Sequence, residues 1–573
     1  MKQIFLLSSL VLLLTITSCD KRQSKQPATS GETMSGLHPY VTAGDPNISR
    51  AFRIACGDIT SNLVPLPAMA TYSVTPVSQK RWDDLTARLV KIAGTGDIIP
   101  SRVAFLTGGM DYGLYQFDVT MHSWDGASFL EPDAVSNALF ATLVLNEDST
   151  IRSGDFITGF GWTLGAWSHY LITGDRSFLK VALEATLGAF DYYEPNEFDP
   201  ELNLFRGPAI IGDGISSYPD FWVKSLKGVG HIKKWPEHNP DKKATVGLGL
   251  PMHALSTNCI NYQAYLVASR MQQELGLPVD KTLLEKAERL KAAINKHFWR
   301  EDAGTYRFLV DPFGGSDQQE GFGNTFAILF GIASKEQADR IFENMHITPQ
   351  GIPINWPVYP RYASPDGMSY GNHNANVWPP VCGLWAQAAA LAGRMDLFAF
   401  ELKKHADRGC RDNQFAENYH PITGEIYGGI QEGRTARSGI GLRAFIEARL
   451  GGDGEATPEA LEELFPAAEG KVGINLWRSC GRNTFSSTAY LRMVLNGLCG
   501  MQLETDGISF YPVIPAGMSP IAVYDIRYRN AILEIHITGE GNKVRKITIN
   551  GKEEAKIPST AKGKQVVEIG MGS

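Results

Sequence analysis

One pattern recurs from about residue 130 to residue 500 and limits the folds open to this chain. An apolar segment of helical periodicity ends at a glycine, and an amphipathic helix begins within a few residues. Glycine suits the position just past a helix end because it adopts a left-handed backbone at no steric cost. These units are predicted αα-hairpins, and their irregular spacing argues against a solenoid of fixed period. The clearest breaks are at Gly174, Gly331 and Gly393.

The regions on either side of this pattern differ from it. Between residues 46 and 120, QKRWDDLTARLVKIAG predicts one helix, whereas RVAFLTGG and YGLYQFDVT predict extended segments. After Gly500, apolar and polar residues alternate in short runs separated by Gly and Pro, with Asn550-Gly551 as a hairpin turn. The sequence therefore predicts a mixed segment over 46–120, a helical body over 121–500 and a small β domain over 501–573.

The first residues predict export. Lys2 precedes an apolar run that ends near Ile16, too short to span a bilayer and typical of a signal peptide. The stretch ITSC resembles a bacterial lipobox, which implies removal of residues 1–18 and lipidation of Cys19. Residues 19–45 are predicted to be a flexible tether, because residues 20–35 are polar and rich in Ser and Pro. We expect a bacterial lipoprotein held to the membrane only by its lipid, on the periplasmic side, with the cell surface as the alternative.

Charge and motif content exclude several functions. The net charge is −7 and Lys and Arg are scattered without a basic stripe, so nucleic acid is not expected as a partner. Cysteines form no C-x-x-C pair, which leaves a structural zinc site unsupported, and the sequence does not pair them in disulfides. No P-loop, Rossmann, H-E-x-x-H or G-x-S-x-G motif occurs. We therefore expect no cofactor and no metal, and the oligomeric state stays open.

Long loops between the hairpins hold the candidate site. The loops 194–222, 302–324, 351–380 and 411–437 are rich in Gly, Trp, Tyr, Pro and Asp. Loops of this length are usually functional or disordered, and the aromatic content argues against disorder. Within the last loop, FAENYHPITGE gathers a carboxylate, an amide, a phenol and an imidazole beside a Pro-x-x-Gly turn. This stretch is either a polar turn or a stiffened loop that holds Glu417 for catalysis.

The stretch FAENYHPITG resembles the F-x-E-x-Y-x-P-x-T-G loop of the six-hairpin, or (α/α)6-barrel, glycosidases, in which the Glu is the catalytic base. The likeness runs from about residue 105 to the C-terminus, and it is greatest to the glycogen-debranching-like and mannosylglycerate-hydrolase-like branch related to processing α-glucosidases. It implies a mainly α fold, an (α/α)6 barrel with a small C-terminal β domain. It also implies an exo-acting, inverting hydrolase of α-linked oligosaccharides, glucoside- or mannoside-like. Further similar segments lie at 255–265, 318–332, 371–393, 485–501 and from FYPVIP onward.

The resemblance also has departures. Phe485-Ser486, after a long insertion over 430–484, stands for the usual Trp-Ser pair, and Ala375 replaces a Gly after His373-Asn374. Both bear on the substrate more than on the fold.

An inverting glycosidase needs a general acid and a general base about 6.5–9.5 Å apart, so that water fits between base and sugar. Glu417 is the predicted base. The loop 204–222 offers two acids, of which Asp213, in Gly-Asp-Gly-Ile, is the position that the resemblance favours. Burial beside Ile211 and Ile215 would raise the pKa of Asp213, as an acid requires. Asp213 could instead form only an Asp-Gly turn, and Asp220 is then the second choice.

Several side chains are candidate sugar contacts. Phe117 and Asp118 resemble the superfamily's aromatic-x-Asp element that holds the terminal sugar. Tryptophan rings stack on sugar faces, although a single Trp more often packs in a core. Trp378 precedes two prolines, which predicts the start of a helix. Glu320 could bind a hydroxyl or cap the following helix. The remaining candidates are Trp124, Trp162, Tyr419, His373 and Asn374.

Two other functions stay open at this stage. A polysaccharide lyase on a similar helical toroid would use Tyr419 and His420 near a substrate carboxylate. A non-catalytic glycan-binding lipoprotein would use the aromatic loops alone and needs no carboxyl pair.

Overall fold

The computed structural model describes residues 38–65, 79–99, 103–109, 113–154, 159–210, 214–223, 231–314, 316–432, 474–476 and 479–572. The predicted signal peptide, the lipidation site Cys19 and most of the predicted tether lie outside these residues.

Six helices within the described ranges form a closed inner ring. Each packs against the next in chain order, and the last returns to the first. Their side chains are buried almost all round, and in one of them every residue from Pro379 to Ala390 is buried, because each helix has neighbours on several sides. In order, the ring consists of α3 (Gln116–Trp124), α6 (Trp162–Thr173), α10 (Leu255–Leu275), α12 (Gly321–Leu329), α14 (Pro379–Leu391) and α18 (Thr484–Arg492).

Amphipathic helices pack outside this ring and connect its members. α7, α11, α13 and α15 each pack against the inner helix that precedes them, and α1 packs against α15 and α18. The glycines that break the predicted hairpins have positive φ values of 71°, 65° and 74° at Gly174, Gly331 and Gly393. The predicted αα-hairpins and (α/α)6 barrel are confirmed. The outer helices are α1 (Pro46–Ser61), α2 (Gln79–Ala93), α4 (Pro132–Ala141), α7 (Arg176–Glu197), α11 (Lys281–Phe298), α13 (Lys335–Asn344) and α15 (Met395–Asp412).

Local chemistry fixes where the outer helices begin. The Asp175 carboxylate accepts hydrogen bonds from the first-turn amides of α7, and Asp280 does the same for α11. Ser334 and Gln337 form a capping box at the start of α13. Such caps satisfy amides that have no partner within the helix.

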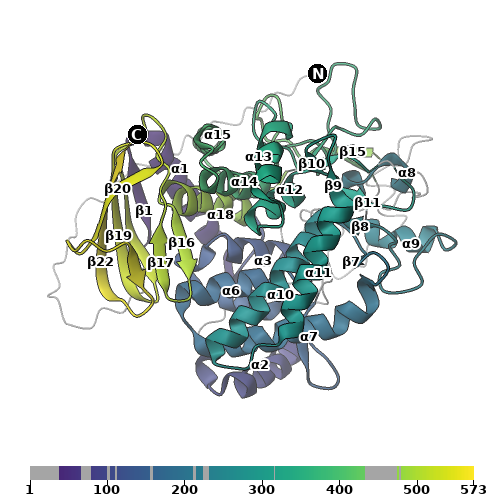
Figure 1. Cartoon of the computed structure of the whole chain (residues 1–573), viewed down its shortest axis with the longest axis horizontal. Coiled ribbons are helices and arrows are strands. Elements are labelled where there is room, and N and C mark those ends of the chain that lie inside the picture. The colour runs from purple at the N-terminus through teal and green to yellow at the C-terminus, as the bar shows by residue number, and fades with distance from the viewer. Residues whose placement is uncertain are drawn as a thin grey trace, which may run out of the picture. The chain divides into compact units, whose positions relative to one another are not determined.

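The C-terminal strands form a β region that includes a strand from the other end of the chain. β1 pairs antiparallel with β18, with Tyr40 opposite Tyr524, and Figure 1 shows this purple strand among the yellow ones. The predicted tether is therefore too long at its C-terminal end, since residues 40–43 lie in the sheet and Asp45 caps α1. The five-stranded sheet has the order β1 (Tyr40–Ala43), β18 (Ile521–Tyr528), β19 (Asn530–Thr538), β22 (Lys562–Gly572) and β20 (Lys543–Ile549). A three-stranded sheet joins β16 (Met501–Glu504), β17 (Gly507–Phe510) and β21 (Lys556–Pro558).

Of two local secondary-structure predictions, the turn at Asn550-Gly551 is confirmed and the extended segment YGLYQFDVT is corrected. Asn550 and Gly551 form the expected tight turn, both with positive φ. YGLYQFDVT is not extended throughout, because α3 begins at Gln116. Its β-branched pair Val119-Thr120 favours a strand locally, and packing inside the ring overrides that preference.

Short antiparallel pairs connect the helices. They are β2 (Leu63–Pro65) with β3 (Val103–Phe105), β4 (Leu143–Leu145) with β5 (Ile151–Ser153), β6 (Phe198–Asp199) with β7 (Leu204–Phe205), β9 (Trp299–Arg300) with β10 (Thr305–Tyr306), β8 (His253–Ala254) with β11 (Leu309–Val310), β12 (Gln319–Glu320) with β13 (Asn355–Trp356) and β14 (Ile430–Glu432) with β15 (Ile474–Leu476).

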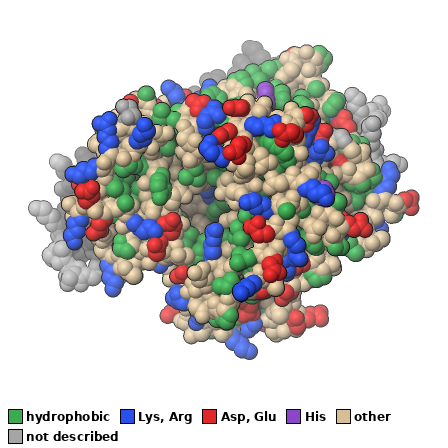
Figure 2. All heavy atoms as spheres, in the orientation of Figure 1, with side chains coloured by type: hydrophobic (Ala, Val, Ile, Leu, Met, Phe, Trp, Pro, Cys, Tyr) green, Lys and Arg blue, Asp and Glu red, His purple; other side chains and the backbone are tan. Residues whose placement is uncertain are grey.

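The described surface has no visible basic stripe on the face shown in Figure 2. On the face shown in Figure 2, Lys and Arg side chains are interspersed with Asp and Glu. No helix in the described part of the chain is both long enough and apolar enough to cross a membrane.

Candidate active site

The N-terminal ends of the inner helices meet at one end of the ring. Short extended segments precede three of these helices and are linked sideways by backbone bridges. Val377, just before α14, pairs with Pro353 on one side and with Tyr419 on the other. Segments 353–355, 376–378 and 418–420 thus lie side by side, and we call them the mouth ladder. It brings the FAENYHPITGE loop to this end of the ring.

Glu417 lies next to this ladder, and both its backbone amide and its carboxylate bind the backbone of Cys480. Its amide donates to the Cys480 carbonyl at 2.8 Å, and its Oε2 accepts from the Cys480 amide at 3.1 Å. The next amide, of Asn418, donates to Ser479 Oγ at 2.9 Å. Phe415 donates its amide to Asp58 of α1 at 2.7 Å. Glu417 is 5% exposed, and the Cys480 amide, in the chain before α18, holds one oxygen of its carboxylate.

Tyr419 and His420 support the loop. Tyr419 is fully buried, its hydroxyl accepts from the Ala416 amide at 2.8 Å, and burial raises the pKa of its phenol to about 12. His420 Nδ1 accepts from the amides of Ile422 and Thr423, and Nε2 faces the Met368 carbonyl at 3.0 Å. The predicted sugar contact of Tyr419 does not fit this placement. Neither side chain is presented as the base that a lyase would need.

Aromatic side chains from four inner helices converge at the same end. The Phe117 ring lies 5.9 Å from Trp378 and 5.5 Å from Phe485, and it also contacts Phe322. His373 stacks on Trp378 with ring centroids 4.8 Å apart. Asp118 follows Phe117 in the first turn of α3 and is partly buried. The structure therefore brings Phe117 and His373 together around Trp378 of the mouth ladder.

Two predicted platforms lie elsewhere. Trp162 is fully buried, and its indole N–H donates to the Leu139 carbonyl at 3.1 Å, so it belongs to the core. Trp124 ends α3, about 10 Å along the helix from Phe117. It packs on Phe330 at the C-terminal end of α12, with the Arg492 guanidinium over its ring at 4.7 Å. Both are corrections, because sequence alone does not show which end of a helix faces the ligand.

Asn374 and Glu320 have structural partners. Asn374 is fully buried, with Oδ1 accepting from the Tyr359 amide at 3.0 Å and Nδ2 donating to Asn355 at 2.9 Å, so both ends of its amide are bound within the protein. Glu320 is also fully buried, and its Oε2 accepts from the amide of Ser256, the second residue of α10, at 3.0 Å. It therefore caps the neighbouring inner helix and not the helix that follows it, which corrects the predicted cap. Burial raises the pKa of Glu320 to about 8.

The candidate acid Asp213 lies outside the described residues, but the chain on both sides of it is anchored. Before it, the Ile210 amide donates to Ser256 Oγ at 3.1 Å. After it, the Ser217 carbonyl accepts from Tyr359 at 3.0 Å, and Ser216 donates to the Asn372 carbonyl. The alternative acid, Asp220, forms an ion pair with Arg361 at 2.5 Å.

The loop 351–378 therefore contacts both carboxylate-bearing loops. It holds residues 215–217 through Tyr359, Arg361 and Asn372. It holds the Glu417 loop through the paired backbones of Val377 and Tyr419, whose two hydrogen bonds are 3.0 and 2.9 Å long.

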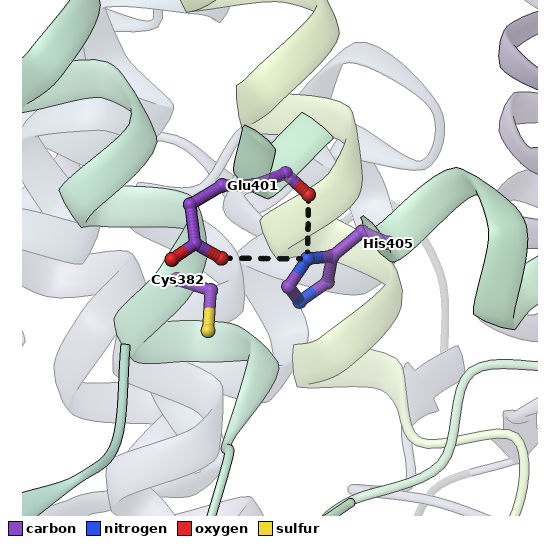
Figure 3. Close-up of side chains that lie close together, drawn as sticks. All are labelled: Cys382, Glu401 and His405. Carbon is purple, nitrogen blue, oxygen red and sulfur yellow. Dashed lines mark hydrogen bonds and ion pairs between the residues drawn. The ribbon is translucent and has the colours of Figure 1, made fainter. Parts of the chain in front are cut away.

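One group of side chains has the composition of a metal site. Cys382 of α14 and Glu401 and His405 of α15 place their donor atoms within 4.8 Å of one another, as Figure 3 shows. Two of the three side chains already have close partners: Glu401 Oε1 accepts from the Ile352 amide at 2.7 Å, and Arg408 Nη2 lies 3.0 Å from both ring nitrogens of His405. A buried guanidinium opposes a second cation here. The donor set fits the role of counter-charge to Arg408 better than that of a metal site.

Arg408 itself was not anticipated from the sequence. Its guanidinium lies 4.8 Å from the centroid of the Tyr419 ring, and Nη1 donates to the Gln350 carbonyl. The available signal was the placement of Glu401, His405 and Arg408 at helical spacing on the otherwise apolar face of α15.

Residues 157–437 match the family model of the mannosylglycerate hydrolase MGH1-like glycoside hydrolase domain. Nearly half of the chain is thus similar to a glycoside hydrolase domain. The matched segment runs from just before α6 to beyond the Glu417 loop, so it contains four of the six inner helices that the structure describes.

One of the solved structures that resemble this chain has a TM-score above 0.5 and shares its fold. A sialidase superposes with a TM-score of 0.59 at 12% identity, over 93% of this chain and 42% of the sialidase chain. A GH78 family rhamnosidase of Bacillus sp. GL1 gives a TM-score of 0.46 at 12% identity, over 93% and 44% of the two chains. A GH63 mannosylglycerate hydrolase from Thermus thermophilus gives 0.45 at 14% identity, over 60% and 96%. The chain thus spans less than half the length of the first two proteins, and no curated protein matches it.

Proposed function

We propose that this protein is an exo-acting, inverting glycoside hydrolase that acts on α-linked oligosaccharides of the glucoside or mannoside type. The observation that carries the proposal is the docking of two carboxylate-bearing loops on the loop 351–378 at the mouth of the ring. An active site assembled in this way places carboxyl groups from different hairpins around one space, as a pair acting across a glycosidic bond requires.

Each carboxyl group has a distinct role in this proposal. Glu417 is the general base that removes a proton from water as the water attacks the anomeric carbon. Asp213 is the general acid that protonates the leaving oxygen, with Asp220 as the alternative. The contacts of Glu417 to Cys480 favour a base of fixed direction, which reduces the freedom lost on reaching the transition state.

The stereochemistry of the first product tests this mechanism. Purified protein is given α-linked di- and oligosaccharides, and proton NMR follows the anomeric signal from the first minutes. A β-anomer as the initial product supports a water-separated pair. An α-anomer means that a covalent intermediate forms, and the proposed role of Glu417 is then abandoned.

The same preparations separate the other functions. A lyase creates an unsaturated product that absorbs in the ultraviolet, which hydrolysis never does. A non-catalytic binding protein shows calorimetric sugar binding without turnover.

We also propose that the protein is a lipoprotein anchored through Cys19 on the periplasmic side. The supporting feature is the lipobox-like stretch at residues 16–19. Palmitate incorporation that is lost in Cys19→Ser supports the anchor, and digestion by protease added to intact cells would place the protein on the surface instead.

A further inference from the structure

The loop that carries Glu417 is bound along its backbone by the stretch 479–483, which lies just before α18. The Asn483 amide donates to the Phe415 carbonyl at 2.8 Å. Two residues further on, Glu417 binds the Cys480 backbone through both its amide and its carboxylate. The direction of the Glu417 carboxylate therefore depends on where the stretch 479–483 is held.

The stretch 479–483 contains a backbone conformation that needs support from outside. Arg482 has a left-handed backbone with φ at 48°, which a residue other than glycine rarely adopts. Such a conformation costs free energy and persists only where the surrounding structure holds it. The Arg482 carbonyl accepts from Asn62 Nδ2 at 2.6 Å, and the Gly109 amide donates to the neighbouring Gly481 carbonyl at 3.1 Å. This turn is thus fixed by segments that come long before it in the sequence.

Two side chains at the C-terminal end of α1 support both the Glu417 loop and the stretch 479–483. Asp58 Oδ2 accepts from the Phe415 amide at 2.7 Å. Asn62, the residue directly after α1, donates to the Arg482 carbonyl and also to Thr484 Oγ1 at 2.9 Å. The two side chains are about one helical turn apart, and they are 4% and 3% exposed. We call Asp58 and Asn62 the α1 pair.

We propose that the α1 pair positions the proposed general base without contacting the substrate. The inference rests on the base role proposed for Glu417. A general base works only when its carboxylate lies within hydrogen-bond reach of the attacking water, and a shift of about 1 Å costs on the order of 10²-fold in rate. α1 precedes residues 157–437, the segment that matches the glycoside hydrolase family model, so the reaction depends on a part of the chain outside that match.

Changes of similar shape separate positioning from general damage to the fold. Asp58→Leu removes the acceptor of the Phe415 amide, whereas Asp58→Asn keeps an oxygen that accepts from it. Asn62→Asp replaces the donor to the Arg482 carbonyl by an acceptor. We expect kcat to fall about tenfold or more in Asp58→Leu and Asn62→Asp, with KM changed less than about twofold. Asp58→Asn should keep most of kcat.

A second comparison shows whether the α1 pair acts through Glu417. In the Glu417→Gln chain, adding Asp58→Leu should lower the rate no further, because the group that Asp58 positions has already lost its function. A change that only lowers the folded fraction reduces the rate by the same factor in both backgrounds. An equal factor in both backgrounds therefore overturns the inference.

Amide hydrogen exchange, measured on the full chain, needs no substrate. The amides of residues 415–418 and 479–483 should exchange faster in Asp58→Leu and in Asn62→Asp, because local opening of these stretches costs less without the α1 pair. Both variants are compared with the unmodified chain under the same conditions.

Asp125→Asn is the matched control for the exchange and the rate. Asp125 is also a buried aspartate beside α18, but it binds Arg492 at the opposite end of that helix. This variant should lower the melting temperature, while kcat and the exchange of residues 415–418 and 479–483 stay the same.

The outcomes separate this inference from the hydrolase proposal. If Asp58→Leu and Asn62→Asp keep kcat while Glu417→Gln loses it, the positioning role is overturned and the base remains. Full activity in Glu417→Gln removes the base and the positioning role together. If no glycan is turned over, the exchange decides alone: unchanged exchange overturns the inference, and faster exchange confined to the two stretches supports the hold of the α1 pair on the Glu417 loop.

Discussion

The Arg408 guanidinium of α15 covers the ring of Tyr419, two residues from Glu417, with 4.8 Å between Cζ and the ring centroid. The outer helix α15 thereby packs against the loop that carries the proposed base. Burial raises the pKa of Glu401 to about 7, and Arg408 opposes that rise, so the two groups depend on each other's charge.

Arg408→Met should disturb this support. Removing the guanidinium leaves the buried Gln350 carbonyl without that donor and takes away a charge that favours ionised Glu401, which should cost about 1–3 kcal/mol. We expect a lower unfolding free energy and a kcat that falls more than KM changes, since the loop and not the sugar contact is affected. Denaturant unfolding and steady-state kinetics measure both. Glu401→Gln in the same chain should restore part of the stability, and Lys403→Met, on the exposed side of α15, should change neither quantity.

Glu417→Gln should abolish most of the activity without harming the fold. A positioned general base contributes on the order of 10²–10⁴ in rate, and a glutamine can still accept from the Cys480 amide but cannot take a proton. Initial rates and thermal melting measure the two effects. Glu425→Gln, on the exposed side of the same loop, is the control and should keep full activity. Equal rates for both variants would remove Glu417 from the mechanism.

Trp162 and Trp378 should respond in opposite ways to replacement by phenylalanine. Trp162→Phe removes the indole N–H that donates to the Leu139 carbonyl and Thr142, and it leaves a smaller ring in the core, so the unfolding free energy should fall by about 1–3 kcal/mol while KM stays the same. Trp378→Phe removes an indole N–H that has no partner among the described residues, so stability should hold and sugar binding should weaken. A raised KM in Trp162→Phe would contradict this assignment and indicate that Trp162 contacts the sugar.

Stability should decline from neutral to mildly alkaline pH. Burial raises the pKa of Glu320 to about 8, of Asp58 to about 7 and of Asp125 to about 6, all above their unfolded values. A raised carboxyl pKa means that the folded state binds more protons. This stabilisation is complete below the unfolded pKa and is lost as pH rises through the folded pKa.

Melting temperatures at about pH 7 and pH 8.5 should therefore differ, with the higher value at the lower pH. Below pH 7 the buried His122 and His169 act in the opposite sense, because burial lowers the pKa of each to about 3. Glu320→Gln should reduce that difference, because its carboxyl contributes at the upper end of the range. Glu285→Gln, exposed on α11, should leave the difference as it is. A melting temperature that rises toward the alkaline end would contradict this account.

The sequence predicted those features that local chemistry determines. Glycines at helix ends, prolines at the first two positions of α14 and alternation after Gly500 all act within a few residues, and the structure has the corresponding elements. The ends of the inner helices were harder to assign. α3 carries Phe117 at the mouth and Trp124 at the far end, and both are aromatic residues beside Asp in the sequence.

Partners from distant segments could not be predicted at all. Glu320 caps α10 and not α12, and Asp58 of α1 holds Phe415 across 357 positions of the chain. Asn258 and Asn376 are both asparagines before or within an inner helix, and only the structure shows that one fastens backbone while the other has no partner among the described residues. Each depends on which backbone groups lie nearby, which is a property of the closed ring.

The pairing of β1 with β18 also orders events during synthesis. Tyr40 can pair with Tyr524 only after nearly the whole chain has been synthesised. The contact between α1 and α18 likewise forms only when most of the chain is present. The ring itself closes only when α18 reaches α3. Because contacts so distant in sequence form late, the growing chain passes through an open stage in which apolar helix faces are uncovered. Because these apolar faces stay uncovered until the last segments are synthesised, we expect chaperones to bind the unfinished chain.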